Sequence, residues 1–127
     1  MTENEIGTVA IASAITVHRE LGPGLLESIY EKALLYELIQ HDLSVISQVD
    51  VPVKYKNVIF NIGFRADIII ENKVILELKS VEKILDVHKK QLQTYLKLTQ
   101  LKLGYIFNFN TPLLKNGIVR CVNGLDD

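Results

Sequence analysis

The sequence predicts an α/β fold in which a mixed central sheet is flanked by helices. Helical and strand periodicities follow one another along the chain in the order α-α-β-β-β-α-β-β. One predicted helix connects two strongly apolar strand segments, and such a crossover favours a right-handed parallel connection between the two strands. The composition, 48% hydrophobic and 23% charged, is ordinary for a globular protein and agrees with a fold of this class.

Two helices are expected in the first third of the chain. Apolar residues recur at helical spacing over residues 6–20 and again over residues 25–40. Between them, residues 21–24 read LGPG, and one proline with two glycines ends a helix. The apolar stripe of the first helix is Ile6, Val9, Ala10, Ala14, Val17 and Leu21. The stripe of the second helix is Leu26, Ile29, Tyr30, Ala33, Leu34 and Leu38.

Strand periodicity begins after residue 42. Valines at alternate positions over residues 45–53 predict a half-buried strand, and Pro52 indicates that this strand is interrupted or lies at an edge of the sheet. Residues 56–57, Lys-Asn, mark a turn into a second strand over residues 58–70. The sequence therefore predicts a hairpin of two strands after the helices.

The second half of the chain alternates strand, helix, strand and strand. Residues 71–73 mark a tight hairpin loop before a strand over residues 74–78, and the near-continuous apolar character of that strand favours a central position. Helical spacing returns over residues 84–101, with Leu85, Leu92, Leu96 and Leu103 expected to point inward. The last two strands are expected at residues 103–109 and 118–122.

The length of 127 residues is close to the commonest domain size, so residues 1–127 are expected to form a single domain. The chain starts with acidic residues, and no run reaches the ~18 apolar residues of a membrane span, so no signal peptide or membrane contact is expected. The single cysteine, Cys121, can form neither an internal disulfide nor a zinc site built from thiols. The expected location is therefore the reducing cytoplasm.

The net charge of −1 bears on nucleic-acid binding. Proteins that bind a duplex usually carry a basic excess, because phosphate contacts supply most of their affinity. Binding to nucleic acid must here depend on a local basic cluster, a metal ion or a partner. One candidate basic cluster follows residue 82. It is either an ordinary solvent-exposed surface or a surface that contacts the phosphates of a nucleic acid, and it consists of Lys83, Lys89, Lys90, Lys97 and Lys102.

Three charged residues interrupt strands that are otherwise apolar. Asp67 lies in the segment RADIII, and Glu77 and Lys79 lie in the segment VILELK. Glu77 and Lys79 are two residues apart on a strand and share a face, and the hairpin brings Asp67 beside them. Burying an unpaired charge costs several kcal/mol, so these residues form either a salt bridge across the hairpin or a site for chemistry. Two carboxylates suit Mg²⁺, which prefers oxygen ligands.

The Asp…Glu-x-Lys pattern of these strands resembles the PD-(D/E)XK nuclease superfamily, whose core runs helix, three strands, helix, strand. Residues 24–30, GLLESIY, look like the signature of the GxxExxY family within that superfamily. Residues 91–95, QLQTY, are similar to the QxxxY motif of the RecB-like exonuclease branch. The resemblance extends over nearly the whole chain, residues 17–109. Ala66 stands where the proline that names the superfamily would precede Asp67.

This resemblance implies a restriction-endonuclease-like core and Mg²⁺- or Mn²⁺-dependent hydrolysis of phosphodiester bonds in DNA or RNA. The implied metal ligands are Asp67, Glu77, the carbonyl of Leu78, and Glu27. Lys79 would orient the attacking water or offset negative charge in the transition state. Glu27 has a second interpretation, as a solvated residue whose charge suits the first turn of its helix.

Gln91 and Tyr95 are four residues apart and share a helix face with His88, one turn earlier. We expect Gln91 to belong to the catalytic group, and Tyr95, His88 and Lys89 to contact the substrate. The alternative is an ordinary helix surface with a half-buried tyrosine. Structural roles are expected for His18, Tyr30 and Cys121.

Two functional hypotheses follow from these residues. The first is an enzyme, a metal-dependent nuclease that acts on DNA or RNA. The second is a catalytically inactive module that uses the same fold to bind nucleic acid or a protein partner, and the near-neutral charge favours it. Nucleic acid is the expected partner in both cases, and a homodimer is compatible with the sequence.

Overall fold

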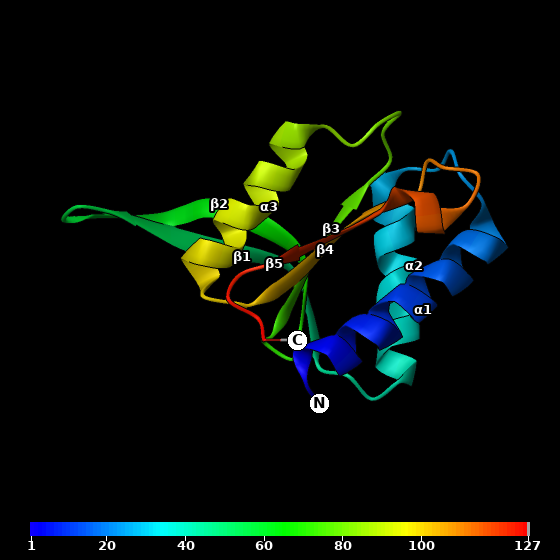
Figure 1. Ribbon diagram of the computed structural model, residues 1–127, viewed down its shortest axis with the longest axis horizontal. Coiled ribbons are helices and arrows are strands. Elements are labelled where there is room, and N and C mark those ends of the chain that lie inside the picture. The colour runs from blue at the N-terminus through cyan, green and yellow to red at the C-terminus, as the bar shows by residue number, and fades with distance from the viewer. Residues whose placement is uncertain (127) are drawn as a thin grey trace.

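The computed structural model describes residues 1–126 and confirms the predicted α/β fold (Figure 1). The predicted order of helices and strands is also confirmed, with one short 3₁₀ helix, η1, added before the last strand. The elements are α1 (Glu3–Leu21), α2 (Glu27–Gln40), β1 (Val45–Tyr55), β2 (Val58–Ile70), β3 (Val74–Lys79), α3 (Asp86–Thr99), β4 (Leu103–Asn108), η1 (Leu114–Gly117) and β5 (Ile118–Val122).

The five strands form one mixed sheet in the order β1-β2-β3-β4-β5. β3 and β4 pair in parallel, as expected from the helix that connects them, and the other neighbouring pairs are antiparallel. β3 has the central position that its apolar sequence predicts. β1 is an edge strand, which agrees with Pro52, because a proline cannot donate a hydrogen bond to a neighbouring strand.

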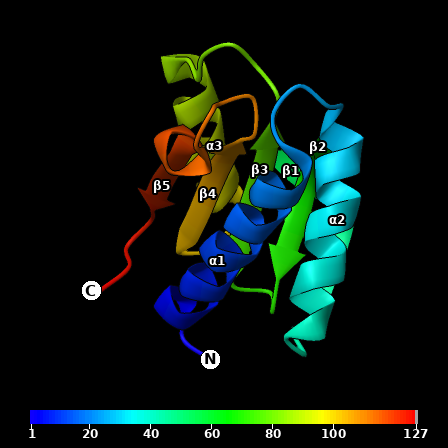
Figure 2. The same ribbon diagram turned by 90° about the vertical axis from the view of Figure 1, so that its right-hand side faces the viewer.

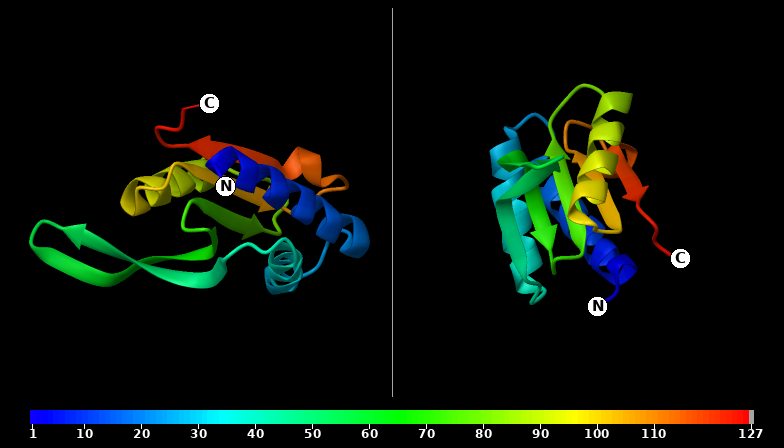
Figure 3. Two further views of the ribbon diagram at one scale, coloured as in Figure 1. Left: turned by 90° about the horizontal axis from the view of Figure 1, so that it is seen from below. Right: turned by 90° about the vertical axis from the view of Figure 1, so that its left-hand side faces the viewer.

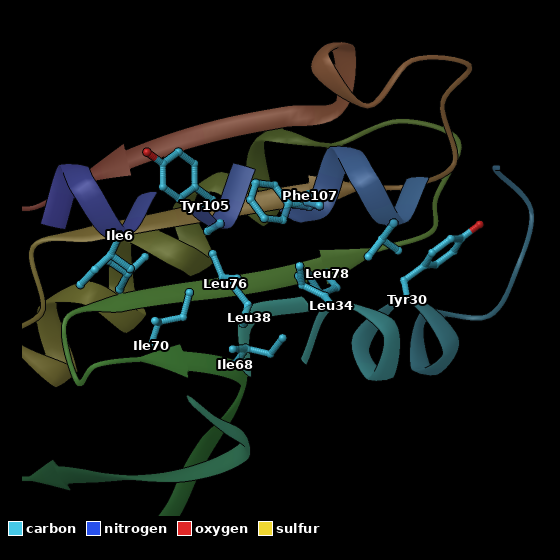
Figure 4. Close-up of a cluster of buried hydrophobic side chains, with 14 of the residues drawn as sticks. Ile6, Tyr30, Leu34, Leu38, Ile68, Ile70, Leu76, Leu78, Tyr105 and Phe107 are labelled. Carbon is cyan, nitrogen blue, oxygen red and sulfur yellow. The ribbon is translucent and has the colours of Figure 1, made fainter. Parts of the chain in front are cut away.

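Helices cover both faces of this sheet. α1 and α2 lie side by side on one face, and α3 lies on the opposite face (Figures 2 and 3). The larger hydrophobic cluster packs α1 and α2 against the sheet through residues such as Leu34, Ile68 and Phe107 (Figure 4). A smaller cluster packs α3 against the other face through residues such as Leu92 and Ile75. The sheet therefore has a core on each side.

Four residues of the predicted apolar stripes are exposed, and for them the prediction of an inward position is wrong. Leu26 and Leu85 immediately precede α2 and α3, which begin two residues later than expected, so neither lies on the buried face of its helix. Leu21 is the last residue of α1, beside the turn that leads away from the core. Ile29 is exposed because the buried stripe of α2 is narrow and consists of Tyr30, Leu34 and Leu38.

The loop between α1 and α2 is held by Tyr30, which is fully buried. Gly22 ends α1 with a φ of 73°, which a residue with a side chain rarely adopts. The Tyr30 hydroxyl donates to the carbonyl oxygen of Gly22 over 2.6 Å and accepts from the N–H of Leu25 over 3.0 Å. The Tyr30 ring stacks on Phe109 with 4.4 Å between ring centroids. Tyr30 thus has the structural role that was expected.

Within residues 1–126, no helix combines the length and the apolar character that crossing a membrane requires.

Candidate metal centre

A tight turn places the two carboxylates of the predicted site side by side. Glu71 and Asn72 both have a φ of 52°, and the N–H of Lys73 donates to the carbonyl oxygen of Ile70 over 2.9 Å, which closes the β2–β3 hairpin. The antiparallel register that follows pairs Ile68 with Leu76. The next residue on each strand is Asp67 on β2 and Glu77 on β3, so the hairpin brings these two residues together.

The direction of the β3 side chains follows from alternation along the strand. Leu76 and Leu78 belong to the cluster under α1 and α2, whereas Ile75 belongs to the cluster under α3. Glu77 and Lys79 therefore share the α3 side of the sheet with Ile75. Lys79 is half-buried and forms no direct ion pair with Asp67 or Glu77 in the described part of the chain. The alternative of a salt bridge across the hairpin is not what the structure shows.

The Asp67 carboxylate is fixed by a main-chain hydrogen bond. Its Oδ2 atom accepts from the N–H of Leu78 over 2.8 Å. This bond uses one oxygen of the carboxylate and leaves the other, Oδ1, available for another partner. The bond thus places a negative charge beside Glu77 and close to the main chain of β3.

Glu77 is a buried acid with an unsatisfied oxygen. Only 8% of its surface is exposed, and its Oε1 atom is buried without a hydrogen-bond partner among residues 1–126. Burial, followed by repulsion from the Asp67 charge, raises the pKa of Glu77 from 4.5 to about 8, while the charge of Lys79 acts in the opposite direction. A buried, unpaired oxygen of this kind is costly, and a bound cation would satisfy it.

The residues present fit a hard divalent cation. Two adjacent carboxylates and main-chain oxygens are the ligands that Mg²⁺ prefers, and Mg²⁺ often keeps several of its waters when only one or two carboxylates bind it. Residues 1–126 contain no group of three or more His, Cys, Asp or Glu side chains arranged to hold a metal ion. Asp67 and Glu77 are therefore the two acidic side chains already placed together for a metal, and main-chain oxygens, water or a further acid that moves toward the cation would supply the remaining ligands.

A small cavity of about 130 Å³ adjoins Asp67 at the start of α2. Two of its lining residues, Glu27 and Leu78, are predicted site residues. The full lining is Glu27, Ser28, Glu31, Gln48, Asp67 and Leu78. The structure thus brings Glu27 and Leu78 to Asp67, and it adds polar side chains that the sequence analysis missed.

Glu31 and Gln48 are the missed residues with the clearest connection to this cavity. The Nε2 atom of Gln48 donates to Oε1 of Glu31 over 2.6 Å. Burial raises the pKa of Glu31, and the charges of Asp67 and Glu27 raise it further, against the hydrogen bond from Gln48. Glu31 could have been found in the sequence, because it lies four residues after Glu27 and shares its helix face.

Gln48 carries no comparable sequence signal. It lies on β1 between Ser47 and Val49, which pair with Ile68 and Ala66, and it therefore stands opposite Asp67. Its φ of 51° lies in the left-handed region, which is unusual for a residue in a strand. Neither the pairing nor the backbone conformation can be read from residue types alone.

On α3, Tyr95 lies close enough to Asp67 and Glu77 to feel their charges. The Tyr95 ring stacks on Phe64 with 3.7 Å between ring centroids. Burial raises the pKa of Tyr95, as do the charges of Glu77 and Asp67, whereas a side-chain hydrogen bond with Gln91 lowers it. Tyr95 and Gln91 are therefore bonded to each other on the side of the sheet that Glu77 faces.

His88 and Lys89 have other surroundings. The Nδ1 atom of His88 accepts from the N–H of Leu85 over 3.0 Å, which caps the start of α3. Lys89 lines a different hollow, of about 280 Å³, and its charge lowers the pKa of Cys121, against the larger effect of burial, which raises it. Neither side chain lines the cavity beside Asp67.

A larger hollow, of about 500 Å³, lies at the end of α1 and contains neither carboxylate. His18 borders it, and its Nε2 atom lies 3.1 Å and 2.8 Å from the carbonyl oxygens of Phe109 and Thr111. These hydrogen bonds join α1 to the segment after β4, which is the structural role expected for His18.

Comparison with known proteins gives one match. A family model described as the PD-(D/E)XK nuclease superfamily matches residues 4–121. No curated protein matches the chain, and no solved structure does. The matched segment contains both carboxylates, Lys79, α2 and α3, and it covers almost the whole chain of 127 residues. The chain therefore belongs to the PD-(D/E)XK nuclease superfamily.

Proposed function

We propose that residues 1–127 form one domain, a Mg²⁺- or Mn²⁺-dependent nuclease that hydrolyses phosphodiester bonds of DNA or RNA. The observation that carries this proposal concerns Oε1 of Glu77, an atom that is buried beside the Asp67 carboxylate and has no hydrogen-bond partner in the described part of the chain. Membership of a nuclease superfamily supports the same reaction. A divalent cation bound here would polarise a phosphoryl oxygen and lower the pKa of a bound water.

The proposed metal ligands are the carboxylates of Asp67 and Glu77 and the carbonyl oxygen of Leu78. Glu27 is a proposed further ligand, because it lines the same cavity as Asp67. The hydrogen bond from the Leu78 N–H orients the Asp67 carboxylate before a cation binds. Such preorganisation reduces the free energy that binding would otherwise spend on ordering the ligands.

Lys79 is proposed to orient the attacking water and to offset negative charge on the phosphoryl group. It shares the α3 side of β3 with Glu77, and its charge already favours the ionised form of that acid. Gln91 is proposed as a catalytic residue that contacts the water or the substrate, with its bond to Tyr95 holding it in place. Tyr95, His88 and Lys89 remain proposed substrate contacts. The capping bond of His88 makes it the weakest of them.

The proposal also includes a branch of the superfamily, a cellular location and binding partners. The motifs at residues 24–30 and 91–95 support the GxxExxY family and the RecB-like branch. A cytoplasmic setting is proposed from the single cysteine, and nucleic acid and a second copy of the chain are the proposed partners.

A second candidate function is a catalytically inactive module of the same fold that binds nucleic acid or a protein. Two observations favour it. The net charge of the chain is −1, and its described residues supply two adjacent carboxylates rather than a group of three acidic or histidine ligands. In such a module Asp67 and Glu77 would occupy the same positions in the fold, but the protein would not hydrolyse a substrate.

Titration of Mn²⁺ into the wild type and Asp67→Ala distinguishes the two functions. Thermal unfolding reports metal binding, and cleavage of labelled single- and double-stranded DNA and RNA reports catalysis. Metal-induced stabilisation and cleavage in the wild type, both lost in Asp67→Ala, support the nuclease. Asp50→Ala is the matched control, because Asp50 pairs with Arg65 at the surface. A wild type whose stability does not respond to Mn²⁺ would eliminate the catalytic function.

A further inference from the structure

The far end of the β1–β2 hairpin extends beyond the helical layers. Residues 53–62, called the arm here, form a two-stranded ribbon that leaves the body of the molecule (Figures 1 and 3). Four large apolar residues of the arm's strands, Tyr55, Val58, Phe60 and Ile62, are 52–61% exposed, and Ile59 is 65% exposed. An isolated two-stranded hairpin is marginally stable in water, so an arm with this composition is expected to have a covering partner.

The register separates the two faces of the arm. Val53 pairs with Phe60 and Tyr55 pairs with Val58, so these four apolar side chains share one face. Lys54 and Ile59 pair with each other and lie on the opposite face. The first group is called the arm face. It continues along β1 toward Val51, which packs in the cluster under α3, so the arm face extends a core surface past the end of that helix.

The arm has two edges, and the edge formed by β1 is interrupted at the base of the arm. β1 is an edge strand, and Pro52 removes one N–H from it. The register also shifts between Val51 and Val53, and a bulge of this kind twists a strand away from a flat partner. An added strand is therefore disfavoured at the β1 edge, whereas the apolar side chains of the arm face are open to stacking.

The chemistry of the arm face favours protein over nucleic acid as its partner. The two cationic residues of the arm, Lys54 and Lys56, lie on the opposite face and at the turn, with Lys56 Nζ 5.3 Å from the centre of the Tyr55 ring. The arm face itself is formed by apolar side chains and one phenol. Nucleic-acid surfaces instead use cations along the contact to neutralise phosphates.

The area of this surface suits association with an identical surface. Tyr55, Val58 and Phe60, the exposed residues of the arm face, together expose roughly 300 Å² of side chain, at about 100 Å² each for half-exposed large side chains. One half of a standard interface buries about 800 Å², a little over half of it apolar. An apolar face placed against its own copy about a two-fold axis is complementary in character, and Lys54, on the opposite face of each arm, stays in water.

We propose that two copies of this chain associate by stacking their arm faces about a two-fold axis. The arm starts from the strands that carry Gln48 and Asp67, so such a dimer would hold two candidate metal centres in a fixed relation to each other. This inference names the surface for the dimer in the proposed function, but it does not depend on catalysis.

Sedimentation velocity of the full chain over about 1–200 μM, without metal or nucleic acid, tests the proposal. The expected wild-type species has twice the 14.4 kDa mass of one chain. Phe60→Thr is expected to weaken dimerisation at least tenfold, because the substitution removes one large side chain from each half of the interface. Ile59→Thr is the matched control, a neighbouring residue on the opposite face, and it should change the dissociation constant less than twofold.

A second measurement covers the case in which Phe60→Thr fails to fold. Tyr55→Cys, made together with Cys121→Ser, should form an intermolecular disulfide under mild oxidation, and Ile59→Cys in the same background should not. A wild type that is monomeric at every concentration would overturn the proposal, as would equal effects of Phe60→Thr and Ile59→Thr. A monomer whose binding to a labelled oligonucleotide is weakened by Phe60→Thr would assign the arm face to nucleic acid instead. Cleavage plays no part in these readouts, so the dimer and the nuclease can fail separately.

Discussion

The N–H of Leu78 donates to Oδ2 of Asp67 over 2.8 Å, so the side chain of one strand is tied to the main chain of the next. The last residue pair between β2 and β3 at this end is Ile68 with Leu76. Beyond that pair, the Asp67 side chain supplies a further hydrogen bond between the two strands. Asp67 therefore has two roles that can be separated. It satisfies a main-chain donor, and it supplies a negative charge beside Glu77.

Substitution of Asp67 by Asn and by Ala should separate these roles. The Asn side chain still offers an oxygen to the Leu78 N–H, so we expect Asp67→Asn to change the free energy of unfolding by less than about 1 kcal/mol. Asp67→Ala leaves that donor unpaired and should cost about 1–3 kcal/mol. Both variants should lose the stabilisation by Mn²⁺. Urea unfolding with and without Mn²⁺ measures both quantities, and an Asn variant as unstable as the Ala variant would contradict this account.

The pKa of Glu77 predicts that stability depends on pH. Folded chains retain the Glu77 proton up to about pH 8, whereas unfolded chains release it near pH 4.5. Stability should therefore fall as the pH rises from 4.5 to 8, by at most several kcal/mol at about 1.4 kcal/mol per unit. Glu77→Gln should remove this fall, and so should Mn²⁺ in the wild type, because a cation stabilises the carboxylate. The measurement is urea unfolding of the wild type and Glu77→Gln at pH 5 and pH 9. An equal pH dependence of the two unfolding free energies would disprove the prediction.

The sequence predicted those features that depend on local pattern. Alternation in the strands and helical spacing predicted every helix and strand except η1, and the apolar strand over residues 74–78 predicted the centre of the sheet. The hairpin signal at residues 71–73 was sufficient to place Asp67 beside Glu77, because a tight turn determines the register of the strands that follow it.

Features that depend on long-range packing were not predictable from the sequence. Gln48 stands opposite Asp67 because of the β1–β2 register, and its residue type carries no sign of this. The exposure of Leu26, at 74%, depends on where α2 begins. The arm face is also invisible in the sequence, since alternating valines and aromatics are typical of a covered strand as well as of an exposed one.

Lys79→Met should separate catalysis from metal binding. The proposed role of Lys79 concerns the water and the phosphoryl group, so its loss is expected to lower the cleavage rate about 10²–10³-fold, as loss of one charge-stabilising group does in other enzymes. Mn²⁺ binding should be unchanged or tighter, because a positive charge near Glu77 is removed. Calorimetric titration of Mn²⁺ and a cleavage assay on the same samples test this. Lys115→Met, an exposed lysine on η1 outside the basic cluster that follows residue 82, is the control.

Glu31→Gln should weaken Mn²⁺ binding several-fold although the residue was not predicted. Glu31 lines the cavity beside Asp67, and its carboxylate is held by Gln48 at 2.6 Å, so its negative charge adds to the field that attracts a cation. Glu27→Gln, which alters a proposed metal ligand in the same cavity, should have a comparable or larger effect. Glu37→Gln on the same helix is the matched control, because Glu37 does not line the cavity. Calorimetric titration that shows equal affinities for Glu31→Gln and Glu37→Gln would remove Glu31 from the site.

Tyr30→Phe should destabilise the loop that carries Glu27 without changing the packing of the ring. The substitution keeps the stack on Phe109 but removes the hydroxyl that bonds the Gly22 carbonyl and the Leu25 N–H. Two part-buried main-chain groups lose their partner, so unfolding should become easier by about 1–3 kcal/mol. Tyr36→Phe on the same helix should change little, because Tyr36 is exposed. Limited proteolysis adds a local readout: faster cleavage within residues 22–26 of Tyr30→Phe, under conditions where both variants remain folded, shows that the hydroxyl orders the loop. Equal proteolysis of the two variants would show that the stack on Phe109 suffices.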